Sequence, residues 1–172
     1  MNEIAQFAPG LDRIEAGSLY PHQADGVAYL LSKKRVILAD DMGLGKTRQA
    51  IVAMEAGAPD GKVLVVCPAS LKLNWKREIQ MVDASAEVEV LGVDKEANRE
   101  PRWVIVNYDI LRKHAERLHA VEWSGVILDE AHFIKNASQR TNHCLKLLGV
   151  QADAHAPFIG PEYVFLLTGT PM

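Results

Sequence analysis

One segment of the chain has the composition of a phosphate-binding loop. Residues 40–47 read DDMGLGKT, and the common pattern for such a loop is G-x-x-x-x-G-K-S/T. The end of this pattern is satisfied by Gly45, Lys46 and Thr47. Asp40 stands where the first glycine of the pattern belongs. The part that contacts phosphate is therefore present, and the alternative interpretation is a glycine-rich turn with a surface lysine.

Each residue type in this segment has a defined role beside a phosphate group. Gly43 and Gly45 let backbone N–H groups turn inward around phosphate oxygens, and the N-terminus of a following helix adds a partial positive charge. The Lys46 ammonium would reach the β- and γ-phosphates of a nucleotide, and the Thr47 hydroxyl would ligate Mg²⁺. The segment therefore predicts a site for Mg·ATP.

A pair of carboxylates follows a second apolar run, where residues 126–132 read VILDEAH. A carboxylate at the end of a parallel strand can face the Mg²⁺ that Thr47 holds, so Asp129 suits metal binding. Glu130 suits the positioning and deprotonation of an attacking water. Helix capping is the alternative role for such a pair, and the presence of Lys46 and Thr47 in the same chain favours catalysis.

Two further polar groups accompany the acidic pair. Residues 167–171 read LTGTP, in which Gly169 allows a tight turn and the two threonines offer hydroxyls near the pair. A plain turn is the alternative interpretation of this segment. His132 ends the DEAH sequence, and we expect it either to bridge to Thr168 or Thr170 or only to pack.

The elements that position these residues are read from hydrophobic periodicity. Short apolar runs predict strands at residues 35–40, 62–67, 87–91, 103–106, 125–129 and 163–168, with the alternating run EVEVL nearest a sheet edge. Helical patterns predict helices at residues 46–56, 70–82 (with Ser70 as its cap), 108–120 and 137–148.

Strands rich in Val, Ile and Leu that alternate with helices indicate an α/β fold with a mainly parallel sheet covered on both faces. Ligands of such sheets bind at the C-terminal ends of the strands. Three candidate segments fall there: after Ala39, after Leu128 and after Leu167. We assign residues 1–18 to a loosely packed lead-in and residues 19–172 to the domain.

Composition narrows the class of protein. The 172 residues are 48% hydrophobic and 24% charged, as in a globular domain, and the formal net charge of −3 excludes a free-standing basic nucleic-acid binder. Neither a secretory signal nor a run of ~18 apolar residues is present. Cys67 and Cys144 lack metal-ligand spacing and are expected to be buried, reduced thiols. A soluble, intracellular protein is expected.

Six segments follow one another along the chain: LYPHQADGVAYL, LADDMGLGKTRQAI, CPASLKLNWKREI, VNYDIL, LDEAHFIKNASQR and LLTGTP. Together they resemble the Swi/Snf-type ATPases of helicase superfamily two, over residues 19–148 and 164–172. The short spacers and HFIKN look most like the branch with annealing helicases and their bacterial relatives. The resemblance implies two RecA-like lobes with ATP between them, and hydrolysis coupled to movement along double-stranded or branched DNA.

The resemblance also implies residue roles. Gln23 matches the adenine-reading glutamine, whose amide both donates and accepts. Asp40 matches an acidic residue of the family, and the phosphate loop is matched by Asp41, Met42, Gly43, Leu44, Gly45, Lys46 and Thr47. Asp129 and Glu130 match the magnesium and catalytic positions. The segment that couples ATP to DNA is matched by Thr168, Gly169 and Thr170. Arg48, where the family mostly has an apolar residue, either lies over adenine or is a solvated arginine.

Stretches that touch DNA in the family match a further set of residues, which would contact the backbone rather than read sequence: Ser70, Lys72, Trp75, Asn107, Lys135, Asn136 and Arg140. For the charged members the alternative is a solvated surface charge, and for Trp75 it is a core position.

The chain departs from the family pattern after LTGTP, where the second lobe would follow. That lobe brings arginines to the γ-phosphate, worth ~10³–10⁵ in rate, so we expect ATP binding with little turnover. Residues 149–162 form a longer link than usual, with no assigned role. Two other interpretations remain: a binding module that acts through a partner without turnover, and another phosphate-loop enzyme such as a small-molecule kinase. DEAH and LTGTP argue against the kinase.

Overall fold

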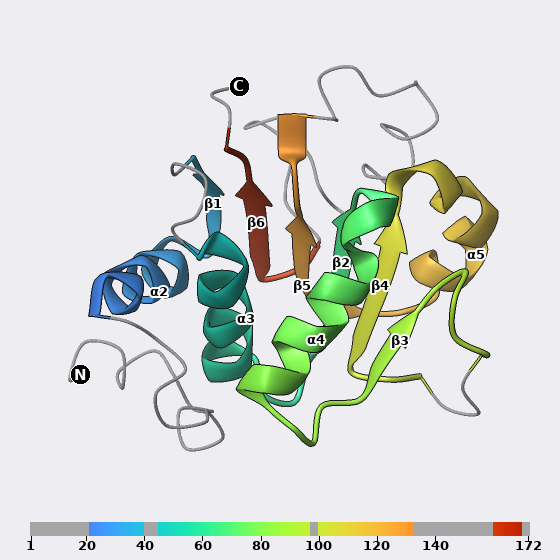
Figure 1. The fold of residues 1–172 in the computed structure, drawn as a ribbon, viewed down its shortest axis with the longest axis horizontal. Coiled ribbons are helices and arrows are strands. Elements are labelled where there is room, and N and C mark those ends of the chain that lie inside the picture. The colour runs from blue at the N-terminus through green and yellow to red at the C-terminus, as the bar shows by residue number, and fades with distance from the viewer. Residues whose placement is uncertain (1–20, 40–44, 97–99, 133–159, 170–172) are drawn as a thin grey trace.

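Six strands form one parallel sheet in the computed structural model of the chain, which describes residues 21–39, 45–96, 100–132 and 160–169 (Figure 1). The strands are β1 (Arg35–Leu38), β2 (Lys62–Cys67), β3 (Val88–Val90), β4 (Trp103–Asn107), β5 (Trp123–Leu128) and β6 (Tyr163–Leu167). Their spatial order is β1-β6-β5-β2-β4-β3, and every neighbouring pair is parallel. The predicted α/β class is confirmed, and β3 is an edge strand as its alternating sequence indicated.

Helices cover both faces of the sheet. They are α2 (Pro21–Lys33), α3 (Lys46–Gly57), α4 (Lys72–Val82) and α5 (Ala115–His119), with 3₁₀ turns η2 (Ala69–Leu71), η3 (Tyr108–Ile110) and η4 (Arg112–His114). Successive side chains of a strand point to opposite faces, so Val65 packs in the core under α2, α3 and α4 while Val66 packs in the core under η3, η4 and α5. This two-sided burial explains why β2 reads KVLVVC without alternation.

Two local predictions are corrected. The helix expected over residues 108–120 is divided into η3, η4 and the short α5. The backbone N–H groups of Leu111 and His114 donate to carbonyls three residues earlier, the pattern of 3₁₀ turns, and the Tyr108 hydroxyl anchors the start of the segment to the Asp129 carbonyl beyond β5. Helix α4 begins at Lys72 rather than after Ser70, because a 3₁₀ turn from Pro68 comes first and Ser70 lies within it.

The prediction of a buried, reduced thiol is confirmed for Cys67. Cys67 is fully buried and reduced, and burial raises the pKa of its thiol to about 12. Among the described residues, no helix is both long and apolar enough to cross a membrane. Cys144, the helix predicted at 137–148 and the lead-in at 1–18 lie outside the described residues.

Candidate nucleotide-binding site

The three segments singled out in the sequence meet at one edge of the sheet. Strands β1, β6 and β5 are neighbours, and Leu38 pairs in register with Leu167. The backbone N–H of Thr168 donates to the Leu38 carbonyl at 3.1 Å, which places Thr168 directly beside the C-terminal end of β1. Asp129 follows the end of β5, one strand further along. The prediction that these strand ends lie together is therefore confirmed.

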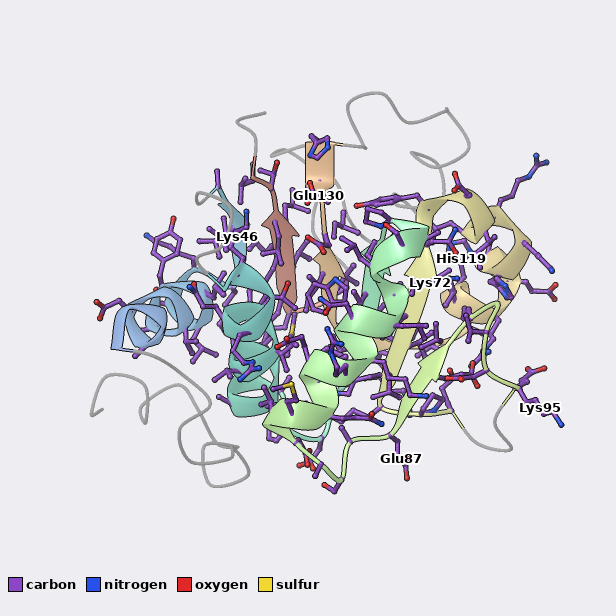
Figure 2. The ribbon with its side chains drawn as sticks, in the orientation of Figure 1. Lys46, Lys72, Glu87, Lys95, His119 and Glu130 are labelled. Atoms are coloured by element: carbon purple, nitrogen blue, oxygen red, sulfur yellow. The ribbon has the colours of Figure 1, made fainter. Side chains whose placement is uncertain are left out.

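Helix α3 begins at this edge with the glycine that its geometry requires. Gly45 has φ 72°, a left-handed conformation that a residue with a Cβ adopts only at a cost, and the helix follows at once with Lys46. Figure 2 places Lys46 at the N-terminal end of α3 and Glu130 beyond the C-terminal end of β5. Lys46 and Glu130 thus lie at the same edge of the sheet. Residues 40–44 lie outside the described residues.

Asp129 is held firmly by its surroundings and is only 9% exposed. Its carboxylate accepts from the Trp75 indole N–H at 2.8 Å and from the backbone N–H of Glu130 at 2.9 Å. Its own backbone N–H donates to the Val66 carbonyl at 2.8 Å, and its carbonyl accepts from the Tyr108 hydroxyl at 2.7 Å. Main chain and side chain are therefore both fixed before any ligand arrives.

The electrostatics of Asp129 reflect opposing influences. Burial raises the pKa of its carboxyl, because desolvation disfavours the charged form. The hydrogen bond from Trp75 and the positive charge of Lys46 lower the pKa. A further positive charge at this edge would favour the ionised carboxylate in the same way.

Glu130 occupies a strained backbone position. Its φ of 51° is left-handed, which is uncommon for a residue with a long side chain, and such strain clusters at functional sites. The Glu130 carboxylate lies 3.2 Å from the His132 Nδ1, and the same nitrogen lies 3.5 Å from the Thr168 hydroxyl. Of the arrangements expected for His132, the structure thus has it next to Thr168, and Thr170 lies outside the described residues.

The residues at this edge fit a magnesium ion. Mg²⁺ prefers hard oxygen ligands and uses one or two carboxylates together with phosphate and water. Asp129 supplies such a carboxylate, and Thr47, in the first turn of α3, supplies a hydroxyl. Within the part of the chain that the structure describes, no group of three or more His, Cys, Asp and Glu side chains forms a metal cluster. One carboxylate and one hydroxyl leave the other positions around such an ion to phosphate oxygens and water.

Two other predicted nucleotide contacts have different outcomes. Arg48 donates to the Glu78 carboxylate of α4 at 3.0 and 2.7 Å, so its guanidinium is ion-paired rather than solvated. Neither of the two arrangements expected for Arg48 anticipated this partner. Gln23 lies in the first turn of α2, as expected of a glutamine that opens a helix. The loop residues Asp41, Met42, Gly43 and Leu44 lie outside the described residues.

The predicted DNA-contacting residues also have different surroundings in the structure. Trp75 is completely buried and bonded to Asp129, so its indole is a core group, which is the alternative expected for it. Lys72 is only 8% exposed, and its ammonium donates at 3.0 Å to the Asn107 side-chain oxygen and at 3.0 Å to the Leu91 carbonyl. Lys72 and Asn107 are therefore both nearly buried and bonded to each other within the domain. Ser70 is exposed at the turn before α4.

The other DNA-facing predictions, Lys135, Asn136 and Arg140, lie outside the described residues. Sequence reasoning missed the Trp75–Asp129 bond. A signal for it exists, because a buried indole N–H needs an acceptor and Trp75 was expected on the apolar face of its helix.

Comparison with known proteins gives the same family along nearly the whole chain. The SNF2-related domain matches residues 22–172. DNA repair and recombination protein RAD54B of Gallus gallus is 31% identical over 94% of this chain. The SWI/SNF-related matrix-associated actin-dependent regulator of chromatin subfamily A-like protein 1 of Xenopus laevis is 34% identical over 90% of it. The solved Sulfolobus solfataricus SWI2/SNF2 ATPase core in complex with dsDNA superposes with a TM-score of 0.76, at 29% identity over 92% of this chain.

The fold and the arrangement of strand ends define a RecA-like α/β domain. The chain belongs to the SNF2-related family, and its homologues are Swi/Snf-type ATPases. It spans 19% of the RAD54B relative, 16% of the SWI/SNF-related relative and 33% of the solved ATPase core.

Proposed function

We propose that this chain is the first, ATP-binding lobe of a DNA-dependent ATPase that moves along double-stranded DNA when it acts with a second RecA-like lobe. One observation carries the proposal. The N-terminus of α3 with Lys46, and the acidic pair that follows β5, lie at the same edge of the sheet, at the C-terminal ends of the parallel strands.

The side chains at this edge have complementary tasks. Lys46 and the first N–H groups of α3 bind and orient the β- and γ-phosphates. Asp129 and Thr47 would hold Mg²⁺, which when bound neutralises charge on the phosphates. Glu130 orients a water molecule and accepts its proton through a carboxylate oxygen. His132 lies beside the Glu130 carboxylate and the Thr168 hydroxyl, a position from which it links the acidic pair to the end of β6.

The DNA part of the proposal is supported by relatives and by one exposed surface. A solved relative is described as an ATPase core in complex with dsDNA, and RAD54B as a DNA repair and recombination protein. In this chain Ser70 and the turn before α4 are exposed, and they offer a hydroxyl and backbone N–H groups to a phosphate. Lys135, Asn136 and Arg140 remain proposed contacts, as does a preference for branched DNA.

The test is a comparison of binding and turnover. Mg·ATP binding is measured by calorimetry on the 172-residue chain and on Lys46→Ala and Glu130→Gln variants, and phosphate release is assayed with and without duplex DNA. We expect Lys46→Ala to lose binding, because the ammonium that offsets the phosphate charge is gone. Glu130→Gln should bind ATP and lose any residual hydrolysis, because an amide cannot accept the water's proton.

The outcomes separate the possible functions. Binding with little phosphate release supports a nucleotide lobe that depends on its second half for turnover. Rapid DNA-stimulated release by this chain would contradict the need for arginines from the other lobe. If Glu130→Gln abolished binding, the division of roles within the acidic pair would be wrong. If the chain binds ATP but hydrolysis stays slow even when a second lobe is added, a module that acts through a partner without hydrolysis would be favoured.

A further inference from the structure

The indole of Trp75 donates a hydrogen bond to the Asp129 carboxylate from the neighbouring helix α4. Trp75 is 0% exposed, and its Nε1–H lies 2.8 Å from Asp129 Oδ2. The other oxygen, Oδ1, accepts from the backbone N–H of the next residue, Glu130. An indole N–H can only donate, so this bond selects one orientation of the carboxylate.

The helix that carries Trp75 is braced on two sides. Lys72 and Glu78 lie three residues before and after Trp75, and residues at this spacing share one face of a helix. Lys72 bonds to Asn107 at the end of β4 at 3.0 Å, and Glu78 pairs with Arg48 in the first turn of α3 at 2.7 Å. Helix α4 is thereby tied to the neighbouring strand and to the helix that follows the phosphate loop. The indole between these two ties has little freedom to shift.

The main chain of Asp129 is fixed by Tyr108, the neighbour in sequence of the Asn107 that bonds to Lys72. Tyr108 directly follows Asn107, and its hydroxyl donates to the Asp129 carbonyl at 2.7 Å. Side chain and main chain of Asp129 are therefore held by Trp75 and Tyr108, two aromatic residues from separate elements that Lys72 and Asn107 join. None of these four side chains is more than 9% exposed.

We propose that Trp75 is a positioning residue, which holds the Asp129 carboxylate in the orientation that binds the Mg²⁺ of the nucleotide complex. The inference rests on the proposed function of this site. Groups that hydrogen-bond to a metal ligand orient it, and their loss typically lowers metal affinity by about 10–100-fold. Trp75 thus sets how strongly Mg²⁺ improves nucleotide binding, while the contacts of the phosphate loop are left unchanged.

A pair of tryptophan variants tests this role. Trp75→Phe keeps an aromatic ring and removes the donor. Trp103→Phe is the matched control, because Trp103 is also fully buried and also donates to a carboxylate at 2.8 Å, that of Glu55 at the far end of α3. ADP affinity is measured by calorimetry in EDTA and over a series of Mg²⁺ concentrations. In Trp75→Phe we expect unchanged affinity in EDTA and a half-maximal Mg²⁺ concentration raised about 10–100-fold. Trp103→Phe should match the wild type in both.

A spectroscopic measurement needs no change at Trp75. The chain has three tryptophans, so its ¹H–¹⁵N spectrum contains three indole signals, and Trp103→Phe and Trp123→Phe assign the remaining one to Trp75. When Mg²⁺ is added to the ADP complex, we expect the Trp75 signal to move and the other two to stay in place. An unmoved Trp75 signal with Mg·ADP bound would overturn the inference, even if Trp75→Phe fails to fold.

The outcomes distinguish a failure of the positioning role of Trp75 from a failure of the proposed function. If the wild-type chain binds Mg·ADP and Trp75→Phe keeps the wild-type Mg²⁺ dependence, the positioning role is wrong and the proposed function stands. Equal weakening in Trp75→Phe and Trp103→Phe would mean a merely structural effect and would also overturn the role. If the wild-type chain binds no nucleotide with or without Mg²⁺, the proposed function and this inference both fail.

Discussion

Arg102 joins the far end of α3 to the base of the sheet, opposite the nucleotide edge. Its guanidinium donates to the backbone carbonyls of Ala58 and Gly61, both at 2.6 Å, and to the Glu55 carboxylate at 3.2 Å. Glu55 also accepts from the Trp103 indole at 2.8 Å. The Glu55 side chain is only 1% exposed and that of Arg102 16%, so water screens this ion pair very little. The pair is therefore a sensitive point for stability.

We predict that Arg102→Leu destabilises the domain strongly. The substitution keeps apolar bulk but leaves the Glu55 carboxylate buried beside a single indole donor. Removal of one partner of a buried ion pair costs about 3–5 kcal/mol. For a domain of this size, where ~1 kcal/mol lowers Tm by ~2–4 °C, that loss corresponds to a decrease of about 6–20 °C. The double variant Arg102→Leu/Glu55→Leu should recover part of the loss, because no charge is then buried alone, while the Trp103 indole N–H loses its acceptor.

Urea unfolding followed by circular dichroism measures these differences for the wild type, both single variants and the double variant. The reasoning is refuted if Arg102→Leu loses less than ~1 kcal/mol, the range of exposed ion pairs. It is refuted equally if the double variant is no more stable than Arg102→Leu. Nucleotide affinity of the folded variant should stay near that of the wild type, since the pair lies at the opposite end of α3 from Lys46.

Two further predictions concern single residues near the site. Gly45→Ala forces a Cβ into a left-handed position with φ 72°, at roughly 1–2 kcal/mol, and should weaken ATP binding and lower Tm, as measured by calorimetry. For Cys67, burial raises the thiol pKa to about 12 from 9.0, so the folded chain keeps a proton that the unfolded chain releases. Stability should therefore fall as pH rises from 9.0 toward 12, and alkylation at pH 8 should require unfolding.

Each of these predictions has a control. Gly61→Ala is the comparison for Gly45→Ala, because a Cβ there would collide with the Ser124 side chain at the N-terminal end of β2, and it should lower stability without a specific loss of ATP affinity. A chain with Cys144→Ser leaves Cys67 as the single thiol. Rapid alkylation of that chain under native conditions, or stability that does not change between pH 9.0 and 12, would contradict the burial argument.

The sequence by itself determined the class of fold and the edge of the sheet where chemistry occurs. Apolar runs such as KVLVVC are local patterns, and a chain of such runs with intervening helices has few stable arrangements other than a covered parallel sheet. Because parallel strands all end at one edge, the positions of Lys46, Asp129 and Thr168 just beyond strands or at a helix start already implied that they meet. Each of those inferences needed only residues close together in the chain.

Only the tertiary structure decided which side chains hold the site in place. The bonds from Trp75 to Asp129, Lys72 to Asn107 and Arg48 to Glu78 join residues 54, 35 and 30 positions apart. Taken singly, Lys72 and Arg48 look like ordinary surface charges, and no local pattern reveals a partner on another element. Whether a lysine meets DNA or a buried amide depends on how α4 packs against β4, which is a property of the assembled core.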